Sequence, residues 1–178
     1  MKQALALLLA GLLALVVQSG IVRVVPHPLC PDLGLLVVVA IGLYWEPLPS
    51  GFALAAVLGY ASDVLSGSLL GQHGLLRLLS FSASRLGGRQ LNLRGVVPLA
   101  VFVAALTLAY ALALHVLQAF FSGTSVSWMS SLGRATVHAL VNGLAAPVVA
   151  AGIASLCSWT GDDEGGRRGF RLDRGTSP

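Results

Sequence analysis

Charge is what this sequence most conspicuously lacks. Of its 178 residues only 10% are Asp, Glu, Lys or Arg, whereas 56% are hydrophobic, and the mean hydropathy is +0.83. A soluble domain carries about a quarter charged residues, so this composition excludes that class and predicts an integral membrane protein. The charges are also unevenly distributed, because residues 95–133 contain none and the last eighteen residues contain eight.

Cysteines are equally scarce. Cys30 and Cys157 stand in no Cys-x-x-Cys or metal-ligand spacing, and we interpret both as small apolar residues. The sequence pI is about 9.7, but the arginines flank hydrophobic segments and are not interleaved with aromatic residues. Such positive charges indicate membrane orientation and do not form a nucleic-acid surface.

Catalytic motifs are missing as well. The sequence has no Gly-x-Gly-Asp of an aspartyl protease, no metal-binding His/Glu cluster and no phosphate loop. Ser66 and Ser68 lie close to His73 in sequence, but no further residue is placed to orient that histidine for nucleophilic catalysis. We therefore expect no enzyme, no cofactor and no metal.

Apolar segments, separated by breaks that contain proline or glycine, fill most of the chain. A spanning helix needs roughly 20 apolar residues, and fewer where other helices shield it. The pattern predicts an all-α polytopic membrane protein, with a six-helix transmembrane bundle over residues 1–158 and helices at about 4–22, 30–45, 49–66, 72–88, 96–121 and 134–157. Residues 159–178 have balanced charge, many glycines and no periodicity, which predicts a disordered polar cytoplasmic tail.

The positive residues predict the orientation of this bundle. With six crossings and the N-terminus inside, eight basic residues lie on the inner face and only Arg23 and Arg134 lie on the outer face. The N-terminus also resembles a signal peptide with a cleavage site after Ser19. The apolar character resumes directly after that site, so we interpret the segment as the first membrane helix.

The third predicted helix carries small residues and one acid at intervals of four: Gly51, Ala55, Gly59, Asp63 and Gly67. Small residues at this spacing let membrane helices approach closely, so we expect contacts that shape the bundle, some of them with a partner's helix. An ionised Asp63 facing lipid would cost roughly 2–3 kcal/mol or more. We expect it to form an internal ion pair with Arg77, and a proton or ion relay is the alternative.

The sixth predicted helix has a polar stripe that is again spaced by four: Arg134, His138 and Asn142. His115 and Gln118 on the fifth helix could meet it. Two interpretations stay open, namely polar contacts that hold the helices together and a ligand pocket.

Two motifs carry a family resemblance. The stretch PDL begins at Pro31, where a proline suits the first helical position and Asp32 suits the first turn. The stretch GFALAAVLGYASDVLSGSLLGQHGL follows, and its tightest element consists of Asp63, Gly67, Gly71 and His73. With the short six-helix pattern, these motifs resemble MreD, the family of rod-shape-determining membrane proteins of bacteria.

The resemblance implies a non-enzymatic component of the cell-elongation machinery in the bacterial cytoplasmic membrane, which supports peptidoglycan synthesis and cell shape through helix contacts. The implied partners are an MreC-like membrane protein, an MreB-like filament and the RodA glycosyltransferase with its transpeptidase, surrounded by membrane lipid. It also implies the six-helix architecture of the substrate-binding subunits of energy-coupling-factor transporters. A vitamin-binding subunit of that kind is the alternative function, and it should have an aromatic-lined cavity near the outer face.

Overall fold

The structure is a computed structural model that describes residues 2–67, 70–93, 95–122 and 128–168. All regular secondary structure in these ranges is helical, with six α-helices and one short 3₁₀ helix: α1 (Lys2–Ile21), η1 (His27–Leu29), α2 (Leu33–Tyr44), α3 (Leu48–Ser66), α4 (Gln72–Gln90), α5 (Val96–Ser122) and α6 (Trp128–Arg168).

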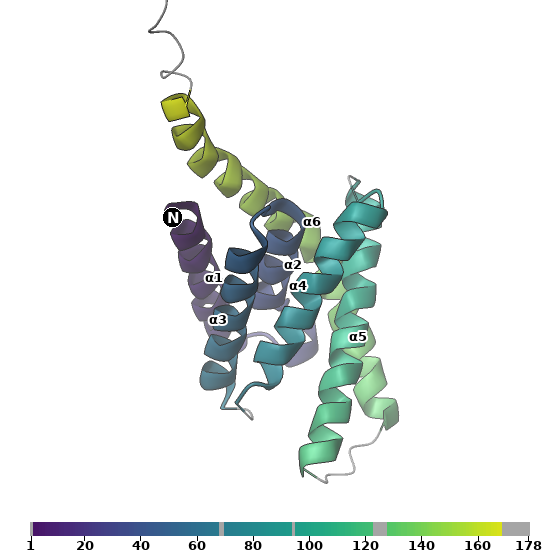
Figure 1. Ribbon diagram of the computed structural model, residues 1–178. Coiled ribbons are helices and arrows are strands. Elements are labelled where there is room, and N and C mark those ends of the chain that lie inside the picture. Colours follow the sequence, from purple (N-terminus) through teal and green to yellow (C-terminus); the bar gives the residue numbers. More distant parts are fainter. Residues whose placement is uncertain (1, 68–69, 94, 123–127, 169–178) are drawn as a thin grey trace, which may run out of the picture.

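Successive helices run in opposite directions, so that α1, α3 and α5 descend in Figure 1 while α2, α4 and α6 ascend. The start of α1 lies beside the C-terminal part of α6, where the Gln3 side chain donates to the Cys157 carbonyl at 3.2 Å. α2 lies at the centre, packed against α1, α3, α4 and α6, and nine of its twelve residues are buried.

Four helical stretches are long and apolar enough to cross a membrane: Lys2–Ile21, Leu48–Ser66, Val96–Phe121 and Ser131–Thr160. Large apolar side chains such as Leu13, Val101 and Val148 are exposed on these helices, as surfaces that face lipid would be. The chain is therefore a helical membrane protein. The twelve residues of α2 extend only about 18 Å, and α4 is less apolar because it carries three arginines.

Two glycines mark places where helix backbones touch. A Cβ at Gly59 of α3 would lie 2.5 Å from the Cα of Gly74 in α4, and a Cβ at Gly143 of α6 would lie 2.9 Å from the Ala100 carbonyl oxygen in α5. No side chain fits at either distance. The close α3–α4 and α5–α6 contacts therefore depend on glycine at these positions.

Helices α1 to α5 begin and end within three residues of the bounds predicted from the sequence, but α6 is longer at both ends. It begins at Trp128, inside the predicted polar connection, and continues to Arg168, so residues 159–168 of the predicted tail are helical. Asp163 and Glu164 precede Arg167 and Arg168 by four residues, an order of charges that favours a helix. Residues 169–178 lie outside the described part.

Candidate functional site

The buried N-terminus of α2 is the centre of a polar network. Asp32 is its N-cap residue, and the Asp32 Oδ1 atom accepts the Leu35 N–H at 2.9 Å. The Asp32 N–H donates to Asn142 Oδ1 of α6 at 2.8 Å, and the Gly34 N–H donates to Gln18 Oε1 of α1 at 3.2 Å. The first turn of a helix leaves N–H groups unsatisfied, and here side chains from three helices satisfy them.

This geometry corrects the predicted start of the second helix. Asp32 occupies the cap and Pro31 precedes it, whereas the sequence placed Pro31 at the first helical position and Asp32 in the first turn. The reason is that the Asp32 carboxylate accepts a backbone N–H three residues on, which is the geometry of an N-cap. The helix consequently begins at Leu33.

Arg77 is the buried cation of the network, with 2% of its side chain exposed. Its Nη2 atom lies 3.2 Å from Asp32 Oδ1, and its Nη1 atom donates to the Leu58 carbonyl of α3 at 3.0 Å. Gly34 makes room for the guanidinium, because a Cβ there would lie 2.5 Å from both Nη atoms. Arg77 therefore ties α4 to α2 and α3 at once.

Asp63 does not form the predicted ion pair with Arg77, and that prediction is wrong. The Asp63 carboxylate, which is fully buried, accepts the backbone N–H groups that begin α4: Gly71 at 2.9 Å, His73 at 2.9 Å and Gly74 at 3.2 Å. A helix N-terminus offers orphan N–H groups and the positive end of the helix dipole, so an acid is stabilised there without a cationic side chain.

Gly67 and Gly71 shape the connection that brings Asp63 to α4. Their φ angles are +63° and +96°, a left-handed conformation that glycine adopts without steric cost. Gly67 ends α3, and Gly71 immediately precedes α4. Both residues therefore belong to the turn and not to a helix-packing face.

His73 links α4 to α5 through its side chain. Its Nδ1 atom lies 2.5 Å from the Tyr110 hydroxyl oxygen, and the two rings stack with centroids 6.0 Å apart. The backbone N–H of the same residue is bound by Asp63. His73 thus joins the third, fourth and fifth helices.

The remaining small residues of the α3 stripe are buried inside this chain. Gly51, Ala55 and Gly59 are all buried, and a Cβ at Gly51 would lie 2.4 Å from the ring of Phe81 in α4. The predicted role in shaping the bundle fits this packing. Contact of Gly51 and Gly59 with a partner's helix does not fit this packing, because α4 already covers both positions.

The polar stripe of α6 divides into two parts. Asn142 is fully buried, and its Nδ2 atom lies 3.3 Å from Thr107 Oγ1 of α5 and 3.4 Å from His138 Nε2. Because Asn142 Oδ1 also accepts the Asp32 N–H, this residue joins α2, α5 and α6. It therefore matches the first of the two open interpretations, polar contacts between helices.

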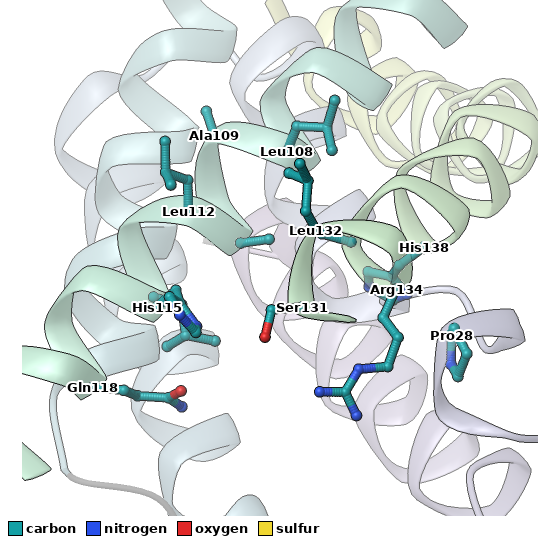
Figure 2. A pocket seen from close by; sticks show the side chains of 13 residues that line it. Pro28, Leu108, Ala109, Leu112, His115, Gln118, Ser131, Leu132, Arg134 and His138 are labelled. Atoms are coloured by element: carbon teal, nitrogen blue, oxygen red, sulfur yellow. The ribbon is translucent and has the colours of Figure 1, made fainter. Parts of the chain in front are cut away.

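The other two residues of the stripe, Arg134 and His138, line a groove instead. Arg134 and His138 of α6 face His115 and Gln118 of α5 across a cavity of about 470 Å³ (Figure 2). Pro28 of η1 contributes to its edge, and most of the remaining lining consists of alanine and leucine. The second open interpretation, a ligand pocket, stays a prediction, and this cavity is where such a pocket would lie.

Several residues of the network were missed by sequence reasoning: Gln18, Thr107, Tyr110 and Arg85. The first three carry hydrogen-bonding groups inside apolar helices, a signal that could have marked them, since such groups are costly to leave unsatisfied in a membrane. Arg85 lies near the end of the predicted fourth helix, and its guanidinium donates to the carbonyls of Trp45 and Glu46, where α2 ends.

Cys30 lies beside the network, next to the start of α2. Its side chain is buried, and burial together with the negative charge of Asp32 raises the pKa of its thiol above the usual value. At neutral pH it is therefore a thiol and a poor nucleophile. Neither Cys30 nor Cys157 forms a disulfide, and in the described part of the chain no three His, Cys, Asp or Glu residues gather to hold a metal ion.

The fold and the site define a helical membrane protein whose buried polar side chains connect its helices and in which α5 and α6 form an amphipathic groove. In comparisons with known proteins, no family model matches the chain, and neither does any curated protein or solved structure.

Proposed function

We propose that this protein is a non-enzymatic, MreD-like component of the bacterial cell-elongation machinery. The observation that supports this proposal best is where the motif residues lie. Asp32 caps α2, Asp63 binds the start of α4, and Gly67 and Gly71 form the turn between α3 and α4. The residues that resemble the family thus serve the architecture, as expected of a scaffold, and both acids are engaged by backbone N–H groups.

The proposal includes six membrane crossings, with both termini in the cytoplasm. The alternating directions of the helices favour this topology (Figure 1). α2 crosses although it is short, because other helices surround it, and α4 crosses because Arg77 is paired inside the bundle and Arg85 caps α2. Arg89 lies in the last turn of α4, at the proposed cytoplasmic end.

Cysteine labelling tests this topology. In a variant without Cys30 and Cys157, a cysteine at Val24, which is 86% exposed between α1 and η1, should react with a membrane-impermeant maleimide in intact cells. A cysteine at Gln90 should react only after permeabilisation. Labelling of position 90 in intact cells would rule out the proposed orientation.

A depletion experiment tests the function. Rod-shaped cells that depend on this protein should become round when its synthesis stops, and the intact chain should co-purify with an MreC-like membrane protein. Cells that keep their shape, but need an external vitamin to grow, would replace this proposal with the transporter alternative. The matched readout is therefore vitamin uptake, which should not change on depletion if the elongation role is correct.

One observation favours that second candidate, a vitamin-binding subunit of an energy-coupling-factor type transporter. The α5–α6 groove lies at the proposed outer end, and its volume of about 470 Å³ falls within the usual range of ligand sites. However, none of the lining residues whose side chains the structure describes is Phe, Tyr or Trp. The lining therefore offers a planar vitamin ring little to stack on, and we rank this candidate second.

A further inference from the structure

The depth of the α5–α6 groove matches one leaflet of a bilayer. On α5 the lining extends from Leu108 to Gln118, which is about 15 Å along a helix axis. The hydrocarbon core of a bilayer is about 30 Å thick. Because both helices contain candidate membrane spans, the groove runs from about the middle of the membrane to one surface.

The polarity of the groove changes along this depth. Leu108, Ala109 and Leu112 line one end, while Gln118, Arg134 and Ser131 lie toward the other, as Figure 2 shows. The apolar end lies deeper in the membrane, since the polar residues come from the last turns of α5 and the first turns of α6. The groove is thus apolar where acyl chains lie and polar where headgroups lie.

The polar end is also suited to an anion. Arg134 is exposed. Among the residues whose side chains the structure describes, the ion pair is that of Arg77 with Asp32, and Arg134 has no acidic partner there. The described residues of the lining include no carboxylate. The Ser131 hydroxyl is buried and has no hydrogen-bond partner in the described part of the chain, so it can donate to an oxygen atom of a ligand.

We propose that this groove binds one anionic phospholipid, with an acyl chain against Leu108 and Leu112 and the phosphate beside Arg134 and Ser131. A single amphiphile matches the depth of the groove, places its acyl chain at the apolar end, and brings a negative charge to Arg134 at the polar end. A partner's membrane helix would fill the apolar end equally well but offers no anion at the depth of Arg134 unless it carries an acid. The inference stands on the groove alone and does not depend on the elongation role.

Native mass spectrometry of the full chain in detergent micelles tests this inference. The chain is titrated with phosphatidylglycerol or with phosphatidylcholine of the same acyl chains. We expect one retained phosphatidylglycerol, held more tightly than phosphatidylcholine. Arg134→Gln should reduce the affinity for phosphatidylglycerol about fivefold, because one basic residue near the membrane surface contributes that much to binding an anionic lipid, and it should leave phosphatidylcholine unaffected.

Matched variants distinguish lipid binding in the groove from lipid adhesion elsewhere on the protein. Arg23→Gln removes an exposed arginine outside the groove and should keep the preference. Ala109→Trp fills the groove and should abolish retention, whereas Ala105→Trp, at an exposed position of α5 outside the lining, should not. Equal retention of both lipids, or equal behaviour of the two arginine variants or of the two tryptophan variants, would overturn the proposal. So would a photoreactive probe, attached to a cysteine at Leu112, that cross-links to a partner's helix and not to lipid.

Discussion

Replacing Asp32 with asparagine should destabilise this protein by about 3–5 kcal/mol, because it leaves Arg77 as an uncompensated buried charge. Asparagine is as good an N-cap as aspartate, so the change removes the charge while leaving the cap of α2 in place. Arg77→Gln should cost a similar amount, since it strands the carboxylate and also leaves the Leu58 carbonyl without its guanidinium donor.

The decisive measurement is a double-mutant cycle on the thermal stability of the purified chain in detergent. Each single change should lower the midpoint by roughly 6–20 °C, at about 2–4 °C per kcal/mol for a chain of this size. The double variant Asp32→Asn with Arg77→Gln should recover at least about 1 kcal/mol relative to the sum of the single losses, because neither stranded charge remains.

The control cycle pairs Arg77→Gln with Asp63→Asn. In this structure the Asp63 carboxylate is bound by N–H groups of α4 and the ion pair of Arg77 is with Asp32. The two losses should therefore add to within about 0.5 kcal/mol. Recovery in the Asp63 cycle together with simple addition in the Asp32 cycle would contradict the assignment of the ion pair.

Replacing Gly59 with leucine should disrupt the α3–α4 contact and with it the whole bundle. Overpacking a well-packed interior costs about 1–3 kcal/mol, and here we expect the upper end or more. The nearest atoms to a new Cβ are the Cα and N of Gly74 and the carbonyl oxygen of His73. Backbone atoms cannot rotate away as a flexible side chain would, so α4 would have to move together with the Asp63 and Arg77 contacts that it carries.

Gly152→Leu in α6 is the matched control, because nothing lies within 4 Å of a Cβ at that exposed glycine. It should leave stability unchanged or raise it by up to about 1 kcal/mol through better helix propensity. Thermal stability in detergent compares the two variants directly. In rod-shaped cells that depend on this protein, the Gly152 variant should maintain the rod and the Gly59 variant should not. Equal stability of the two would show that α3 and α4 are not in backbone contact.

Much of the architecture could be predicted because its signals are local. Hydrophobic runs interrupted by proline and glycine identified six helices, and five of them begin and end within three residues of the predicted bounds. The exception is α6, where the polar residues on both sides of the apolar core were predicted to be non-helical. Helix can continue beyond a membrane wherever the local sequence permits it, and hydropathy does not report that continuation.

The need for polar partners was also visible in the sequence. Asp63 and Arg77 stand in largely apolar surroundings, and membrane physics requires that such groups be satisfied internally. The identity of the partners was not visible. Asp63 and Arg77 are fourteen residues apart and Asp32 and Arg77 are forty-five apart, so proximity in sequence favoured the wrong pair.

The sequence by itself therefore determined the class of the protein, the number and positions of its helices, and which side chains could not face lipid. These properties depend on composition and on short-range periodicity. The tertiary structure decided which acid Arg77 meets, that Asp63 binds a helix N-terminus, and that α5 and α6 separate into a groove beyond Asn142. These depend on how α2 lies against α4 and α6, and helices distant in sequence come together only through packing of the whole bundle.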